Sequence, residues 1–200
     1  ETAFQLANAG SKMVTAFDYS FEAIKKAKTQ FTHKNLIFDV KSIDDISEKY
    51  DCIIMQEVIE HTDQPLEVIK KLSQHLNSKG HLVLTCPSFV NLRGYVWMTL
   101  QTLLDVPMSL TDLHFFIPDD MIEYAAELNL NLTWRTFRHK QSHGEMMILD
   151  LKKRLKNALR DADLNNSKVD QFLIWLEKVG KYIDNEHYNG SIALYHFTPK

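Results

Sequence analysis

Groups that could bind a ligand or move a proton are concentrated in one ten-residue run, QEVIEHTDQP, which extends from Gln56 to Pro65. Glu57, Glu60 and His61 supply two carboxylates and an imidazole. Helical spacing would place Glu57 on one face with either Glu60 or His61. Two carboxylates and an imidazole can hold a hard or borderline divalent cation. Glu57, Glu60 and His61 are therefore candidate metal ligands.

The elements on either side give this run its position in the fold. Residues 50–55 read as a short β-branched strand, and residues 65–76 read as an amphipathic helix that begins with a proline. In open α/β sheets, ligands bind beyond the carboxyl ends of the strands. The run lies at such an end, so a functional site is expected there.

Two further carboxylates end predicted strands earlier in the chain. Asp18 follows a strand at residues 12–17 and precedes a helix that Ser20 caps, and Asp39 follows a strand at residues 35–38. In a dinucleotide-like fold, a carboxylate at the position of Asp18 can accept hydrogen bonds from both hydroxyls of a ribose. Position alone leaves each residue open to a second interpretation, as a turn or strand-terminating aspartate.

Strands and helices alternate through the first half of the chain, which predicts a doubly wound α/β fold with a mostly parallel sheet. Residues 82–86 form a continuous apolar strand suited to the centre of that sheet, after a turn at residues 78–80. The second half adds helices at residues 91–104, 119–128, 145–161 and 167–184, and strands at residues 130–137 and 191–198. The last two strands could pair antiparallel at one sheet edge, with a helical pair inserted between them.

Composition excludes several functional classes. The formal charge of -3 and the pI near 6.3 provide no basic field for extended nucleic-acid binding. Cys52 and Cys86 both fall in predicted buried strands, which suits reduced core thiols in a cytoplasmic protein. The longest apolar stretch, at residues 94–104, is too short and too polar to be a transmembrane segment.

The order of motifs FDYSFEAIKKAK, NLIFDV, YDCIIMQEVIEH and LNSKGHLVLTCPS resembles the class I S-adenosylmethionine-dependent methyltransferases. The E-x-x-E-H run resembles in particular the branch that contains ubiquinone-pathway O-methyltransferases and small-RNA 2′-O-methyltransferases. This resemblance implies the strand order 3-2-1-4-5-7-6, with the seventh strand antiparallel. It also implies that the first strand and its glycine-rich loop precede Glu1. We thus expect one domain over residues 1–200, incomplete at its N-terminus, with a helical insertion or lid at residues 140–190.

The resemblance also assigns roles to individual residues. It implies that S-adenosylmethionine contacts Asp18, Tyr19, Asp39, Val40 and Gln56, with Asp39 at the adenine amino group and the Val40 backbone N–H beside it. It further implies that His61 or His114 is the catalytic base, unless a divalent cation at the E-x-x-E-H run activates the acceptor. Because related proteins with this run have no known metal, His61 could also simply pack beside the cofactor. One departure is Ser88, which stands where the family often has asparagine.

These features predict methyl transfer to a small-molecule acceptor, most readily at oxygen. The acceptor is expected to be apolar or aromatic, because large apolar residues gather between Leu92 and Phe116, although these could instead form the core of a lid. An alternative is 2′-O-methylation of an RNA end, with a basic groove near His114. The residues of that groove would be Arg93, Arg135, Arg138, His139 and Lys140. A second alternative is a non-catalytic scaffold, and the oligomeric state is left open.

Overall fold

The computed structural model describes residues 1–137, 144–180 and 190–200. The chain forms two compact units, Glu1–Lys49 and Tyr50–Lys200. His139 and the other residues predicted for the basic groove at 138–140 lie outside the described residues. Within the described residues, no helix is both long enough and apolar enough to cross a membrane.

The first unit is a two-stranded parallel sheet with its helices. Its elements are α1 (Thr2–Asn8), β1 (Val14–Asp18), α2 (Phe21–Gln30), β2 (Leu36–Val40) and the 3-10 helix η1 (Ile43–Asp45). The Ser20 hydroxyl caps α2 by accepting a hydrogen bond from the Ala23 amide at 3.2 Å, as the sequence predicts. In the register of the two strands, Asp18 lies opposite Val40 and Phe17 lies opposite Asp39. The two aspartates therefore stand at the carboxyl ends of neighbouring parallel strands.

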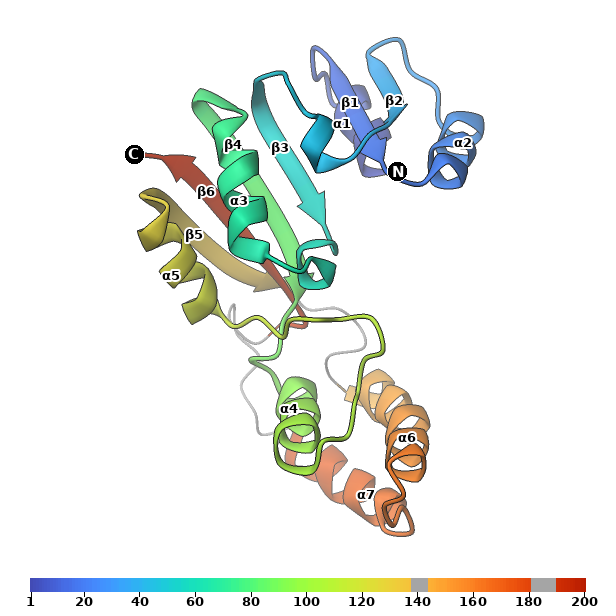
Figure 1. Cartoon of the computed structure of the whole chain (residues 1–200). Coiled ribbons are helices and arrows are strands. Elements are labelled where there is room, and N and C mark those ends of the chain that lie inside the picture. The colour runs from blue at the N-terminus through green and yellow to red at the C-terminus, as the bar shows by residue number, and fades with distance from the viewer. Residues whose placement is uncertain (138–143, 181–189) are drawn as a thin grey trace. The chain divides into compact units, whose positions relative to one another are not determined.

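The second unit contains a four-stranded sheet in the order β3-β4-β6-β5 (Figure 1). The strands are β3 (Tyr50–Gln56), β4 (Leu76–Pro87), β5 (Leu130–Phe137) and β6 (Ile192–Pro199). β3 and β4 are parallel, whereas β6 is antiparallel to both of its neighbours. This is the 4-5-7-6 half of the predicted strand order, and it confirms the doubly wound α/β class.

Helices α3 (Pro65–Gln74) and α5 (Pro118–Glu127) cover one face of this sheet (Figure 1). The covered face buries alternate residues of the strands, as a half-covered sheet requires. Leu82 and Leu84 of β4 and Phe197 of β6 are completely buried there. Residues 109–117 lead into the first turn of α5 and form part of the candidate site.

Two details differ from the sequence-based expectation. The predicted turn at residues 78–80 is wrong, because these residues belong to β4. The register passes from Tyr50 opposite Leu76 to Cys52 opposite His81, so the turn-forming residues produce a bulge inside the strand.

The second difference is that Cys52 is exposed, not buried. Its side chain lies on the sheet face away from α3 and α5, where it lines a groove of about 540 Å³ with His81 and His196.

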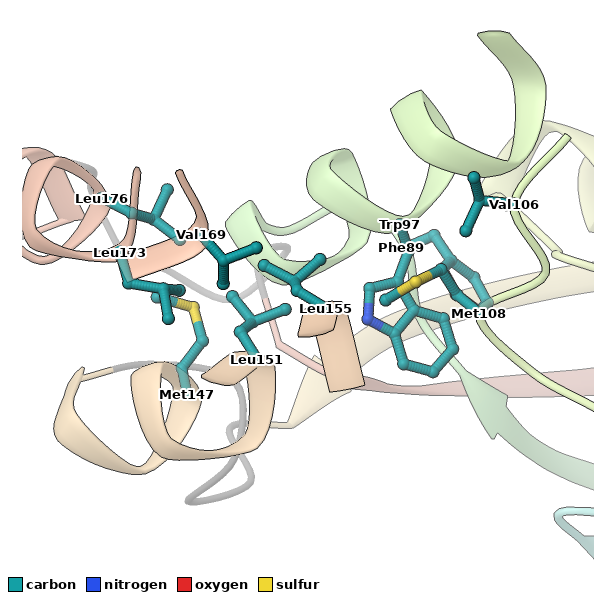
Figure 2. Close-up of a cluster of buried hydrophobic side chains, with 10 residues drawn as sticks. All are labelled: Phe89, Trp97, Val106, Met108, Met147, Leu151, Leu155, Val169, Leu173 and Leu176. Atoms are coloured by element: carbon teal, nitrogen blue, oxygen red, sulfur yellow. The ribbon is translucent and has the colours of Figure 1, made fainter. Parts of the chain in front are cut away.

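A helical lobe follows the carboxyl end of β4. It consists of α4 (Leu92–Leu104), α6 (Gly144–Asp161) and α7 (Val169–Gly180), which Figure 1 shows grouped together. Figure 2 shows the shared core, in which Trp97 lies beside Phe89 and Met108. The other members of this core are Val106, Met147, Leu151, Leu155, Val169, Leu173 and Leu176. Trp97 is thus a core residue of the lobe, one of the two alternatives that the sequence left open.

Candidate functional site

Two loops of the second unit are joined by side-chain and backbone hydrogen bonds, one that follows β3 and one that lies between α4 and α5. One loop spans residues 57–62 and the other spans residues 109–114. The four cross-links are the amides of Leu113 and His114 to the Glu60 carbonyl (2.9 and 3.2 Å), His61 Nδ1 to the Thr111 carbonyl (2.9 Å), and His114 Nε2 to the Thr62 carbonyl (2.8 Å). This reciprocal pairing fixes the residues of both loops relative to one another.

Glu57 stands at the sharp turn that ends β3. Its φ of 50° lies in the left-handed region, which costs a non-glycine residue about 1 kcal/mol or more. Its amide still donates to the Thr85 carbonyl at 2.9 Å. The helical turn begins only afterwards, as the 3-10 helix η2 (Ile59–His61). The expectation that Glu57 shares a helical face with Glu60 or His61 is therefore wrong.

His61 has a defined tautomer in this arrangement. Nδ1 lies 2.9 Å from the Thr111 carbonyl, which can only accept, so Nδ1 carries a hydrogen. In the neutral ring, Nε2 then has a free lone pair. Asp112 Oδ1 lies 3.5 Å from Nδ1, and the side chain of His61 is 40% exposed. The imidazole is thus oriented by its neighbours and still open to a ligand.

Glu60 is the buried carboxylate of the site. Its side chain is only 2% exposed, and Oε2 has no hydrogen-bond partner among the described residues. Oε1 lies 3.9 Å from His61 Nε2. Burial raises the pKa of Glu60 from 4.5 to about 7, with a backbone hydrogen bond lowering it and the charge of Glu57 raising it. Protonated and ionised forms of Glu60 are therefore both populated near neutral pH.

This raised pKa gives a prediction for stability. Above its ordinary pKa the unfolded chain holds an ionised Glu60, while the folded chain keeps the proton until about pH 7. The contribution of Glu60 to the free energy of unfolding is therefore fully present below pH 4.5 and is lost as the pH rises through 7. Glu60→Gln should leave stability unchanged near pH 4.5 and raise it by about 2 kcal/mol at pH 8.

Urea unfolding of both proteins across this pH range measures the difference. Glu127→Gln on the exposed end of α5 is the matched control, and it should show no such pH dependence. A Glu60→Gln difference that is the same at both ends of the range would contradict the assignment.

Three side chains of the joined loops could hold a metal ion. Glu60, His61 and Asp112 offer ligand atoms that all lie within 4.8 Å of one another. Glu57 does not belong to this group. Asp112 takes its place, and sequence analysis missed Asp112. The only signal for it was its position two residues before His114 in the run TDLHFF.

His114 lies in the same region but has a structural contact. Its Nε2 is bonded to the Thr62 carbonyl, and its ring stacks on Phe116 with 5.4 Å between the ring centroids. Each of the two predicted bases thus has one ring nitrogen held by a carbonyl, but His61 is exposed whereas His114 is half-buried and stacked, so His61 is the more accessible of the two. The role of His114 as a base is still a prediction.

The predicted cofactor residues divide between the two units. In the first unit, Asp18 Oδ1 accepts from the Ser20 amide at 2.7 Å, and Tyr19 is 85% exposed. Asp39 Oδ1 accepts from the Val40 amide at 2.9 Å, so that amide is already engaged, and Oδ2 lies 3.4 Å from Lys41 Nζ.

Gln56, the fifth predicted cofactor residue, lies in the second unit and is the exposed last residue of β3. Asp18 is likewise exposed, at the end of β1, and its hydrogen bond to the Ser20 amide engages only Oδ1.

The sequence matches the family model described as a methyltransferase domain over residues 3–169. No individually curated protein matches it. Among solved structures, a candidate S-adenosylmethionine-dependent methyltransferase from Listeria monocytogenes is similar, at 14% identity and a TM-score of 0.59. That match covers 100% of this chain and 85% of the Listeria chain.

Two other similar structures differ from each other in activity. The plantazolicin methyltransferase BamL, bound to SAH and a desmethyl substrate analogue, matches at 13% identity and a TM-score of 0.54, over 100% of this chain and 73% of BamL. The [4+2]-cyclase SpnF matches at 12% identity and a TM-score of 0.59, over 100% of this chain and 70% of SpnF. At these identities the likeness shows the fold alone.

Proposed function

Because the chain belongs to the methyltransferase domain family and is an S-adenosylmethionine-dependent methyltransferase, we propose that it methylates a small molecule with His61 as the base. The observation that carries this proposal is the orientation of His61, whose Nδ1 is held by the Thr111 carbonyl. Methyl transfer is an in-line displacement, so the protein must align the acceptor and remove its proton. An oriented imidazole with a free Nε2 can accept that proton from a hydroxyl or an amine.

Asp18 and Asp39 are the proposed contacts for the adenosine part of the cofactor. They end neighbouring parallel strands, and the Asp18 carboxylate can accept hydrogen bonds from both ribose hydroxyls. Tyr19, Val40 and Gln56 remain proposed secondary contacts. For Val40 this contact requires the Asp39 carboxylate to turn away, because it occupies the Val40 amide at present.

Asp18→Ala should weaken the binding of S-adenosylhomocysteine by roughly 1–3 kcal/mol, because the ribose hydroxyls lose their acceptor. Isothermal titration of the full chain measures this change. Glu22→Ala serves as the control, since Glu22 is an exposed carboxylate of the same unit, in the first turn of α2. Equal weakening by both substitutions would count against a specific contact at Asp18.

A divalent cation at Glu60, His61 and Asp112 is the second candidate mechanism. Its support is the proximity of one imidazole and two carboxylates, of which Glu60 has an unpaired buried oxygen. A bound cation would supply a Lewis acid that lowers the pKa of an acceptor hydroxyl. The measurement that separates the mechanisms is turnover with and without a chelator. Turnover that survives complete removal of metal supports His61 acting alone.

The small-molecule acceptor is favoured over RNA by the contacts of Arg93 and Arg135, the two arginines of the predicted basic groove that lie in the described residues. Arg93 pairs with Asp150 at 2.8 Å and lies over the ring of Trp97. Arg135 lies over the ring of Phe137. Arg93 is therefore already engaged inside the helical lobe. The described part of the predicted groove does not present a cluster of basic side chains that could follow the phosphates of an RNA.

A further inference from the structure

The two joined loops, together with the residues that directly follow them, carry a marked excess of negative charge. Residues 56–64 and 109–120 contain the carboxylates Glu57, Glu60, Asp63, Asp112, Asp119 and Asp120, and they contain no lysine or arginine. The clustering is spatial as well as sequential. Burial is the main cause that raises the pKa of the Cys86 thiol on β4. The charges of the nearby carboxylates raise it further, in the order Glu60, Glu57, Asp112 and Asp120.

Glu60 gives this negative cluster a specific recognition point. Its carboxylate is 2% exposed, with Oε2 unpaired among the described residues and Oε1 beside His61 Nε2. A buried carboxylate oxygen without a partner costs free energy, which a hydrogen-bond donor with positive charge would recover. The side chain of Asp112, 13% exposed, approaches the same imidazole from its other nitrogen.

Apolar side chains stand on the same two loops. Val58 is 42% exposed, Leu113 is 57% exposed and Leu110 is 95% exposed. Large apolar residues so exposed next to buried carboxylates are suited to a ligand with both a charged and an apolar part.

We propose that the acceptor is a small organic amine, recognised in its ammonium form by Glu60 and Asp112 and through its apolar body by the exposed side chains of the two loops. This inference rests on the proposed function, and it replaces the hydroxyl acceptor that the sequence favoured. The same charges disfavour carboxylates, phosphates and nucleic acids as acceptors.

The reaction balances with groups already named. The bound ammonium gives one proton to His61 Nε2 and becomes a neutral amine with a free lone pair. That lone pair forms a bond to the methyl carbon of the donor, while the carbon–sulfur bond breaks and its electron pair stays on sulfur. The products are an N-methylated ammonium ion and a neutral thioether, S-adenosylhomocysteine.

Three probes of matched shape test the charge preference: 2-phenylethylamine, 2-phenylethanol and 3-phenylpropanoate. Each is titrated into the full chain by calorimetry in the presence of a chelator and S-adenosylhomocysteine. The amine should bind about tenfold more tightly than the alcohol, and the carboxylate should bind least. Asp112→Asn should weaken amine binding severalfold. The matched control Asp161→Asn, on the exposed end of α6, should leave amine binding unchanged.

Equal binding of the three probes, no binding of the amine, or insensitivity to Asp112→Asn would each overturn the inference.

A titration with Mn²⁺ separates an organic cation from a metal. If Mn²⁺ binds wild type but not Asp112→Asn, and turnover requires it, the cluster is a metal site and the amine is excluded. Binding of S-adenosylhomocysteine alone is measured in parallel. If the chain does not bind S-adenosylhomocysteine, the proposed function is contradicted. If it binds S-adenosylhomocysteine but methylates the alcohol and not the amine, only the inference that the acceptor is an amine is contradicted.

Discussion

Replacing His61 with alanine should lower kcat by roughly 100- to 10,000-fold, the range for losing a positioned general base. The reason is that the variant loses Nε2, the free nitrogen that the Thr111 contact leaves available. The rate is measured as formation of S-adenosylhomocysteine with an acceptor that the wild-type chain methylates. Affinity for S-adenosylhomocysteine itself should not change, because Asp18 and Asp39 are unaffected.

A structural contribution of His61 can be separated from its chemical one. His61→Asn keeps an N–H donor near the position of Nδ1, so it can retain the hydrogen bond to the Thr111 carbonyl while lacking a base. This variant should be nearly as slow as His61→Ala. His81→Ala is the control, since His81 pairs with His196 on the face of the sheet away from α3 and α5. Activity restored in His61→Asn would show that His61 only holds the loop.

The helical lobe should depend strongly on Trp97. This side chain is 4% exposed and lies beside Phe89 (Figure 2), with 6.0 Å between the two ring centroids. The Arg93 guanidinium lies 4.2 Å from the centroid of the Trp97 ring. Trp97→Ala should lower the free energy of unfolding by about 3–5 kcal/mol, because it removes a large apolar surface and leaves a cavity. Thermal or urea unfolding measures the loss.

Trp175 on α7 provides the same substitution at an exposed position. It is 57% exposed, so Trp175→Ala should change the free energy of unfolding by no more than about 0.5 kcal/mol. Trp97→Phe should cost less than Trp97→Ala, because it keeps most of the buried ring and removes an N–H that is unpaired among the described residues. Similar losses for Trp97→Ala and Trp175→Ala would contradict the core assignment.

Most of the fold could be predicted because its determinants are local. The alternation of Leu130, Leu132 and Trp134 with polar residues predicts β5 with its observed bounds, and Ser20 marks the beginning of α2. Where a local signal was misread, a long-range pairing decided the outcome. Residues 78–80 have turn propensity, but pairing of β4 with β3 makes them a bulge within the strand.

The candidate site could be predicted only in part, for a physical reason. Glu60 and His61 are adjacent in the sequence, and their strand-end position indicates a site. Asp112 joins them through hydrogen bonds between loops about fifty residues apart, a contact that no local pattern encodes. The positive φ of Glu57 was equally hidden, because glutamate carries no preference for that conformation.

The most direct test of the proposed cofactor site is a crystal structure of the chain with S-adenosylhomocysteine. We expect both ribose hydroxyls to lie within about 2.5–3.0 Å of the Asp18 carboxylate oxygens, at the carboxyl end of β1. We also expect the adenine amino group to lie next to Asp39. A bound ligand whose ribose contacts neither of these aspartates would contradict the assignment of the first unit as the adenosine site.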